Sequence, residues 1–181
     1  TCGRRYLQQF GKLPYGYDHK YVYSEIGYNL KMTDLQAAIG VAQIDKLPEF
    51  MTKRKENFQY LYDCLKDFED YFILPQATES SDPCWFGFPL TINNHAVKRT
   101  EFIRYLNDKG IATRLLFSGN VTKQPYFLEY SINHRLASSL INTDTIMNDT
   151  FWIGIYPALR REHIDWVVSS VGKYIKDHVK S

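Results

Sequence analysis

Residues 33–46 and 49–68 each carry apolar side chains three or four residues apart, a spacing that predicts two helices. Their apolar positions are Leu35, Ala38, Ile39 and Ala42, followed by Phe58, Leu61, Leu65 and Phe68. Pro48 lies between the two segments, and the first turn of a helix tolerates proline. We therefore expect either two helices or one long helix with a bend at this proline.

In residues 85–92 successive side chains alternate in a way that predicts a β-strand. Pro89 lacks a backbone donor, which indicates an edge strand or a bulge. One predicted face carries Phe86, Phe88, Leu90 and Ile92, and the other carries Trp85, Gly87, Pro89 and Thr91.

Further apolar runs predict strands over residues 111–117 and 151–156, and helices over residues 97–109 and 161–176. Gly110 ends the first of these helices at a position that favours a left-handed residue. This order of elements predicts an α+β fold. We expect a small three-stranded sheet with helices on one face, preceded by the long helical segment.

Composition narrows the function mainly by exclusion. The chain has 181 residues, 44% of them hydrophobic, which suits one domain with a real core. A net charge of +2, with acids and bases interspersed, argues against a nucleic-acid partner. No apolar run is long enough to cross a bilayer, and the unpatterned cysteines fit a reducing compartment, so we expect no membrane partner and a cytoplasmic location. Because no initiating methionine is present, we also expect a fragment of a longer protein.

Residues 1–30 are rich in tyrosine and glycine and show no helical period, which predicts a long irregular loop. After this loop, Thr33 and Gln36 have the spacing of a capping box. Backbone N–H groups and the positive end of the helix dipole make such a helix start suitable for an anion. Two interpretations stay open from the residues alone: a turn that holds a phosphate, or a capped helix start without a ligand.

Other candidate chemistry is sparse. Asp18, His19 and Lys20 are adjacent, and adjacent side chains do not usually face one site, so we interpret them as part of the loop. The five histidines are scattered, and none has the spacing of a metal ligand pair. The sequence contains neither a Walker loop nor a nucleophile elbow.

Two segments resemble a known family. They are GYNLKMTDLQAAIG at residues 27–40 and NDKGIATR at residues 107–114. Both resemble the pyridoxal-phosphate enzymes that act on nucleotide-linked keto-sugars, which are sugar aminotransferases and dehydratases with the aspartate-aminotransferase fold. The resemblance implies that residues 1–46 are the end of the cofactor domain, a loop plus an interface helix. It also implies that residues 47–181 are the C-terminal small domain.

Several motifs resemble one branch of that family, the 3-dehydrases of CDP-linked 4-keto-6-deoxyhexoses, which serve 3,6-dideoxyhexose and lipopolysaccharide O-antigen synthesis. These motifs are residues 1–6, 13–21, 114–120, 124–127 and 148–157. The resemblance implies a homodimer, a nucleotide-sugar substrate, pyridoxamine or pyridoxal 5'-phosphate, and a [2Fe–2S] cluster. It also implies an NAD(P)H-dependent iron–sulfur flavoprotein reductase as partner. The catalytic base of the branch, a histidine, would lie upstream of residue 1. We therefore expect this chain alone to be inactive and to bind neither cofactor.

The resemblance also assigns roles to five residues. Asn29 would reach the cofactor phosphate of the neighbouring subunit, and Lys31 stands where most of the family has arginine. A lysine suits phosphate as a point charge, without a bidentate fork. Phe86 would be an active-site aromatic residue, Arg114 would meet the substrate diphosphate, and Cys2 would be the last of four cluster ligands. Strand alternation leaves a core position for Phe86 and a solvated side chain for Arg114 equally open.

Two other functions remain open at this level. A plain nucleotide-sugar aminotransferase would have an intact upstream lysine and no neighbouring cysteines. A non-catalytic dimerisation module would use the small helix face at Ala37, Ala38 and Gly40, because exposed apolar surface tends to associate.

Overall fold

The computed structural model describes residues 3–23, 25–28 and 30–179. The chain divides into two compact units, Thr1–Ile44 and Asp45–Ser181. The two predicted helical segments are separate helices: α1 (Asp34–Ile44) ends in the first unit and α2 (Leu47–Leu65) begins in the second. Pro48 lies in the first turn of α2, where its missing N–H removes no helical hydrogen bond.

The first unit starts with a loop held by polar contacts. The Arg5 guanidinium pairs with the Asp18 carboxylate, and the Arg5 Nε lies 2.8 Å from the Asp18 Oδ2. The Asp18 Oδ1 accepts from the backbone N–H of Lys20 at 3.1 Å and so caps the short helix η1 (His19–Tyr21). Asp18 therefore has a structural role in the loop, in agreement with the interpretation made from the sequence.

Helix α1 begins with the predicted capping box. The Thr33 N–H donates to the Gln36 Oε1 at 2.9 Å, and the Gln36 N–H donates to the Thr33 Oγ1 at 3.4 Å. No residue of this helix is buried; Leu35 is 80% exposed and Ile39 is 66% exposed. A helix with large exposed apolar side chains such as these is normally covered by protein. The surface of α1 therefore suits contact with protein rather than water.

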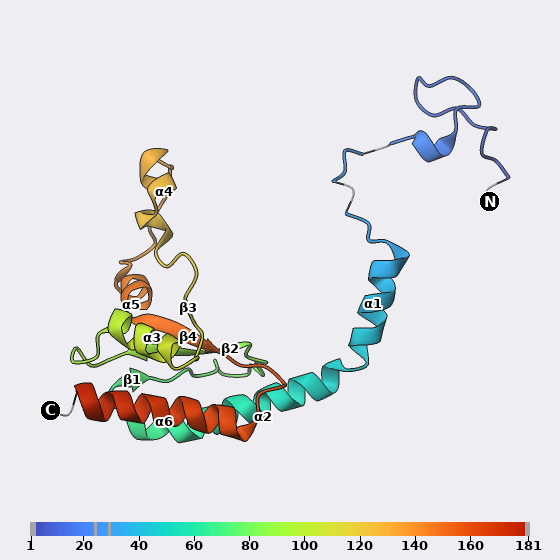
Figure 1. Cartoon of the computed structure of the whole chain (residues 1–181). Coiled ribbons are helices and arrows are strands. Elements are labelled where there is room, and N and C mark those ends of the chain that lie inside the picture. The colour runs from blue at the N-terminus through green and yellow to red at the C-terminus, as the bar shows by residue number, and fades with distance from the viewer. Residues whose placement is uncertain (1–2, 24, 29, 180–181) are drawn as a thin grey trace. The chain divides into compact units, whose positions relative to one another are not determined.

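The second unit is a mixed α and β structure (Figure 1). After α2 its helices are η2 (Lys66–Phe68), α3 (Arg99–Asp108), η3 (Val121–Lys123), α4 (Pro125–Glu129), α5 (Ile141–Asp149) and α6 (Arg161–His178). Its strands are β1 (Phe72–Ile73), β2 (Gly87–Ile92), β3 (Thr113–Leu115) and β4 (Thr150–Gly154). The strands form one antiparallel sheet in the order β1-β2-β4-β3.

The prediction of three strands was wrong, because the sheet has four. The additional strand, β1, pairs Phe72 with Ile92 and Ile73 with Thr91. With only two residues it is too short to show an alternating pattern. The helices α4 and α5 were also not predicted. Helix α5 has no buried residue, so its sequence lacks the apolar stripe that marked the core helices.

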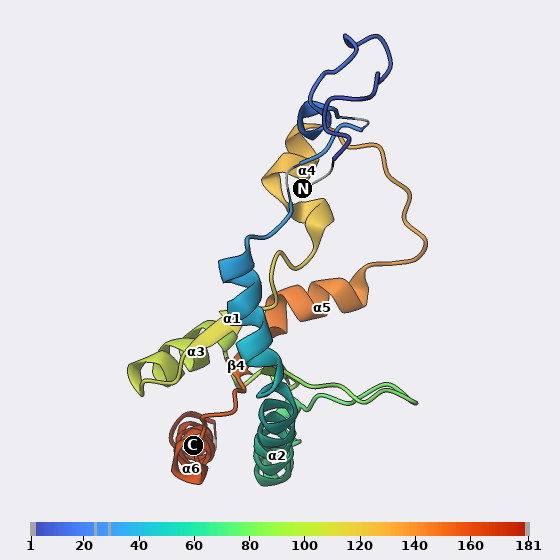
Figure 2. The same ribbon diagram turned by 90° about the vertical axis from the view of Figure 1, so that its right-hand side faces the viewer.

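The core lies between one face of the sheet and the helices α2, α3 and α6. Figure 2 views α2 and α6 nearly end-on, side by side on the same side of the sheet. Phe102 of α3 is fully buried, with ring centroids 5.4 Å from Phe72, 5.7 Å from Phe151 and 4.7 Å from Tyr174. This single aromatic residue joins two strands and α6, so it fixes α3 within the core.

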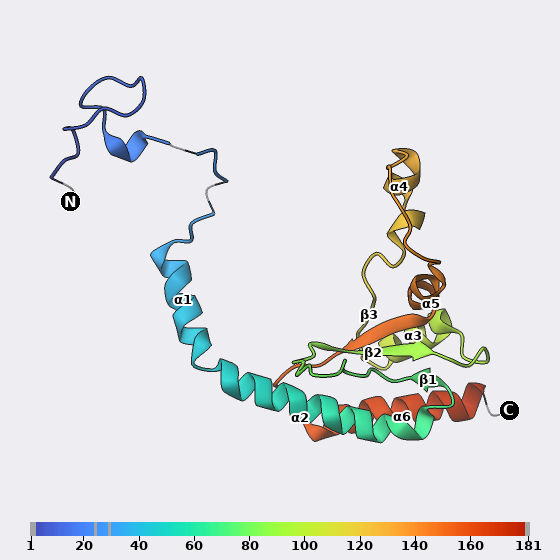
Figure 3. The ribbon, with the colours of Figure 1, turned by 180° about the vertical axis from the view of Figure 1, so that it is seen from behind.

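The sequence predicted helices on one face of the sheet alone, and this prediction was wrong. Helix α5 contacts β2 and β4 and lies on the opposite side of the sheet from α2 and α6 (Figure 3). Thr91 and Thr150 form a hydrogen bond of 2.8 Å between their hydroxyl groups at this end of the sheet. The other end of the same face, toward Gly87 and Gly154, carries the candidate functional site.

The Arg5–Asp18 pair predicts a pH dependence for the loop of the first unit. The hydrogen bond from Arg5, aided by the Lys20 N–H, lowers the pKa of Asp18 from 3.8 to about 2. A carboxyl group with a depressed pKa stabilises the folded loop at neutral pH, and this contribution disappears as the pH falls from about 4 toward 2. NMR titration of the Asp18 carboxyl carbon should give a midpoint near 2. Asp18→Asn should speed amide exchange across residues 5–20. An equal acceleration in Glu25→Gln, an exposed carboxylate of the same unit, would contradict this role.

Candidate functional site

The face of the sheet turned away from α2 and α6 carries a row of three residues from three strands. The strand register places Pro89 of β2, Trp152 of β4 and Arg114 of β3 opposite one another. The next row along, which includes Phe88 and Ile153, is buried in the core. Adjacent residues of a strand point to opposite faces, so Trp152 and Arg114 lie together on the face of the sheet that is turned away from α2 and α6.

Trp152 covers the backbone of Gly87, and this close approach requires a glycine. A Cβ atom at position 87 would lie 2.5 Å from the Cε3 of Trp152, well inside van der Waals contact. The Trp152 ring also packs against Phe86 in a T-shaped arrangement, with ring centroids 5.2 Å apart and an interplanar angle of 79°. Trp152 is thus the centre of a small aromatic surface.

Phe86 does not take the core position that strict alternation allowed. The chain bends at Phe86, one residue before β2 begins, and the side chain is 56% exposed. Its contact with Trp152 shows that it has turned away from Phe88, which is fully buried. The core interpretation of Phe86 was therefore wrong, and the bend is the physical reason.

Arg114 is exposed, as alternation from its neighbours allowed. Among the described residues, its side chain makes one hydrogen bond, from Nη1 to the carbonyl oxygen of Thr113 at 2.9 Å. A guanidinium carries five N–H donors, so most of this side chain can still meet an anion. The family resemblance assigned substrate contacts to Phe86 and Arg114. Both residues thus lie on the same face of the sheet, on either side of Trp152.

No motif in the sequence marks Trp152 as a site residue. The available signal was its place between Phe151 and Ile153, two buried residues of β4, which predicts that Trp152 points away from the core. Within the described chain, its indole N–H is buried without a hydrogen-bond partner.

Lys31 belongs to the first unit and is exposed three residues before α1 begins. A lysine beside the positive end of a helix dipole has the donor chemistry that a phosphate group requires. Asn29 and Cys2, the other two residues assigned to cofactor and cluster, lie outside the described residues. The half-buried Cys64 and Cys84 are free thiols. Residues 3–23, 25–28 and 30–179 contain no group of three or more His, Cys, Asp or Glu side chains arranged to hold a metal ion.

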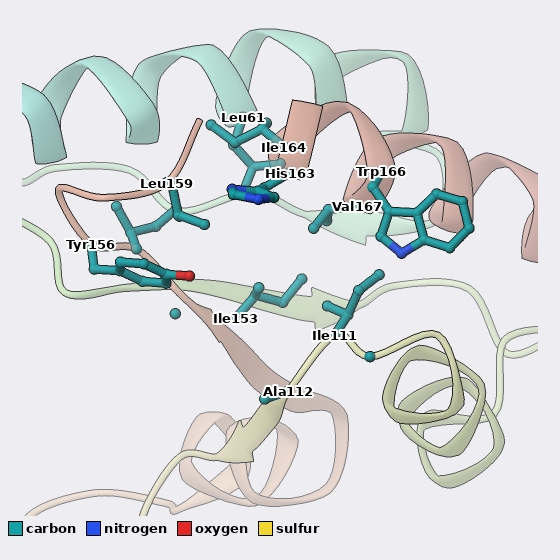
Figure 4. A pocket seen from close by; sticks show the side chains of 13 residues that line it. Leu61, Ile111, Ala112, Ile153, Tyr156, Leu159, His163, Ile164, Trp166 and Val167 are labelled. Atoms are coloured by element: carbon teal, nitrogen blue, oxygen red, sulfur yellow. The ribbon is translucent and has the colours of Figure 1, made fainter. Parts of the chain in front are cut away.

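A separate cavity of about 330 Å³ lies beneath the start of α6, on the core side of the sheet (Figure 4). His163 and Tyr156 face it, while apolar side chains such as Ile153 and Val167 form most of its wall. Both ring nitrogens of His163 lie near Arg160: Nδ1 accepts from the Arg160 N–H at 3.2 Å, and Nε2 lies 3.4 Å from the guanidinium. None of the residues that line the cavity is an aspartate or a glutamate.

None of the helices in the described part of the chain has the length and apolar character that a membrane crossing requires.

The contact between Gly87 and Trp152 gives a stability prediction with a matched control. Gly87→Ala should displace Trp152 and lower the free energy of unfolding by about 1–3 kcal/mol, the usual cost of overpacking. Gly154→Ala, at the position paired with Gly87 in the register, should cause no such loss, because a Cβ there meets nothing within 4 Å. Urea denaturation and tryptophan emission measure both effects. Equal stability of the two variants would contradict the close approach.

Comparison with known proteins gives the family of this chain. The model of the DegT/DnrJ/EryC1/StrS aminotransferase family matches residues 4–172. Over 96% of its length the chain is 53% identical to the lipopolysaccharide biosynthesis protein RfbH of Salmonella typhimurium, and it covers 40% of that protein. It is 42% identical over 97% of its length to the dTDP-4-dehydro-2,6-dideoxy-D-glucose 3-dehydratase of Saccharopolyspora spinosa, of which it covers 37%. The chain thus spans about two fifths of these relatives.

Solved structures agree with this result. The E. coli GDP-4-keto-6-deoxy-D-mannose-3-dehydratase with bound hydrated PLP is 27% identical with a TM-score of 0.74, matching 83% of this chain and 38% of that one. An aminotransferase from Psychrobacter cryohalolentis, at 19% identity, has the same fold with a TM-score of 0.75, over 97% of this chain and 46% of that one. The mixed helical structure with its small antiparallel sheet is therefore an aminotransferase-like fold, and the chain belongs to the DegT/DnrJ/EryC1/StrS aminotransferase family.

Proposed function

We propose that this chain is the C-terminal part of an enzyme that removes the C3 hydroxyl of a CDP-4-keto-6-deoxyhexose, for 3,6-dideoxyhexose and O-antigen synthesis. The observation that carries the proposal is the 53% identity to RfbH, a lipopolysaccharide biosynthesis protein, over nearly the whole chain. Similarity to two 3-dehydratases of nucleotide-linked sugars supports the same reaction type. The CDP carrier rests on the resemblance of the sequence motifs alone.

The exposed row on the sheet has the chemistry that a nucleotide sugar needs. Phe86 and Trp152 offer an aromatic surface against which a base or a sugar ring can pack. Arg114 offers a planar guanidinium that can bind the oxygens of a diphosphate in pairs. We propose that Phe86 and Arg114 contact the substrate and that Trp152 completes their surface.

We propose pyridoxamine or pyridoxal 5'-phosphate as the cofactor, with Asn29 and Lys31 on its phosphate. The exposed cation at Lys31, next to the capped start of α1, fits such a group. When bound, the cofactor supplies the electron sink for the chemistry at C3. No residue of this chain is assigned a proton transfer, since the proposed histidine base lies upstream; the chain by itself would then be inactive and bind no cofactor.

The iron–sulfur part of the proposal rests on Cys2 and on the resemblance alone. A [2Fe–2S] cluster requires four ligands, and one thiolate supplies one of them. The remaining ligands, and the contact with a reductase, would belong to the rest of the protein.

We also propose that the protein is a homodimer. Helix α1 exposes Leu35, Ile39, Val41 and Ile44, each at least 65% accessible within the described chain. Apolar surface of this kind is normally covered by protein. A second copy of the chain, together with the rest of its own subunit, would supply that cover.

Transamination is the second candidate, because the chain is 28% identical over 87% of its length to the GDP-perosamine synthase of Escherichia coli O157:H7 and its family is named for aminotransferases.

The full-length protein, supplied with CDP-4-keto-6-deoxyglucose, NADH and a reductase, should yield a product that has lost its C3 oxygen. Mass spectrometry distinguishes this from a glutamate-dependent amino sugar, which would overturn the dehydrase proposal.

Within that assay, Arg114→Ala should raise the KM for the nucleotide sugar about tenfold or more, since hydrogen bonds to charged groups contribute at that level. The kcat should change little, because the diphosphate is remote from C3. Arg104→Ala provides the control, as Arg104 is an exposed arginine of α3 on the core side of the sheet. An unchanged KM in Arg114→Ala would remove Arg114 from the substrate site.

Cofactor binding gives an independent test in the full-length protein. Asn29→Ala and Lys31→Ala should each lower cofactor retention, because each removes a proposed partner of the phosphate. Absorbance of the dialysed protein measures the retained cofactor. Lys12→Ala, in the preceding loop, is the matched control. Full retention in both variants would count against the assignment of this turn to the cofactor.

A further inference from the structure

The turn that follows β3 has a conformation that its own residues do not favour. Phe117 has a φ of 50°, in the left-handed region, and its N–H donates to the carbonyl oxygen of Leu115 at 2.8 Å. This conformation is disfavoured for a residue with a side chain, because its Cβ comes too close to the following carbonyl oxygen. The Phe117 side chain is 77% exposed, so packing within the chain does not compensate for the strain. Something outside Phe117 must hold the turn.

Asn120 holds the end of this turn. Its side chain is 2% exposed, and its Nδ2 donates to the Asp144 Oδ1 in α5 at 2.7 Å. Its Oδ1 accepts from the backbone N–H of Thr122 at 3.1 Å and from the Thr122 hydroxyl at 2.7 Å, which caps η3. The Lys123 Nζ lies 2.8 Å from the same Asp144 oxygen. Lys123 and then Asn120 lower the pKa of Asp144, so the acceptor is a charged carboxylate at neutral pH.

The turn also lies directly on α5, and α5 is tied to a core helix. A Cβ atom at Gly119, whose φ is 61°, would lie 2.5 Å from the Cγ of Met147. The carbonyl oxygen of Met147 accepts from the Arg99 Nη1 at 2.5 Å, and Arg99 is the first residue of α3. A continuous set of contacts therefore runs from the strained turn through α5 to α3, which packs in the core.

The place of the turn connects it to the open face of the sheet. Arg114 lies in β3, three residues before Phe117. Figures 1 and 3 show the chain leaving β3 on the side that carries α5, away from α2 and α6. The strained turn therefore stands beside the face that bears Arg114, Trp152 and Phe86.

We propose that Asn120 is a positioning residue for substrate binding: its hydrogen bond to Asp144 fixes the turn so that Phe117 and Arg114 are presented together to the nucleotide sugar. The inference rests on the proposed function, because it takes the open face as the substrate surface. Neither Asn120 nor Asp144 contacts the substrate in this account. They act through the backbone of the turn.

The test exchanges the amide of Asn120 and the carboxylate of Asp144, first singly and then together, in the full-length protein. Asn120→Asp would place two carboxylates where a donor now meets an acceptor, and it should raise the KM for CDP-4-keto-6-deoxyglucose about tenfold, as loss of a charged hydrogen bond predicts. The kcat should stay within about threefold, because a single lost hydrogen bond outside the reacting groups leaves the bond-breaking step unaltered. Combining Asn120→Asp with Asp144→Asn restores a donor–acceptor pair and should return the KM toward its original value. Asn142→Asp, the same substitution on an exposed residue of α5, should leave the KM unchanged.

The outcomes separate the two proposals. If the unmodified protein turns over no nucleotide sugar, the proposed function fails and this inference fails with it. If the unmodified protein is active but Asn120→Asp has an unchanged KM, the positioning role alone is overturned. If the double variant regains the thermal stability of the unmodified protein but not its KM, the hydrogen bond between residues 120 and 144 is only structural and the positioning role is overturned. Recovery of both supports the proposal.

Discussion

Burial of one face of the sheet against α2, α3 and α6 is the constraint on which the second unit depends. Phe88, Leu90, Phe151 and Phe102 are fully buried there, and aromatic contacts link the strands to the helices. Because successive residues of a strand alternate, fixing this face fixes what the other one displays. Trp152 and Arg114 are therefore turned outward as a consequence of core packing.

The outward face is shaped by exceptions to regular structure. A bend at Phe86 removes that ring from the core, and the missing side chain of Gly87 makes room for Trp152. Beyond β3, the left-handed backbone at Phe117 is kept in place by the buried Asn120 and by α5. Such strained or tightly approached backbone positions cluster at functional sites, where the surrounding structure holds them.

The first unit is held together by different interactions. Its loop is held by polar contacts such as the Arg5–Asp18 pair, and its helix α1 leaves Leu35, Ile39, Val41 and Ile44 exposed within the described chain. Neither feature provides a hydrophobic core. The chain corresponds to fewer than half of the residues of these relatives.

Much of this structure followed from the sequence. The apolar periods marked α2, α3, α6 and three of the strands, and the Thr33–Gln36 spacing marked the start of α1, because these signals are local and come from residues that pack or cap. Only tertiary structure decided the rest. The two-residue β1 exists because β2 pairs with it, and α5 has no apolar stripe of its own. The placing of Trp152 beside Pro89 and Arg114 depends on strand register, which joins residues far apart in the chain and cannot be seen in any one segment of the sequence.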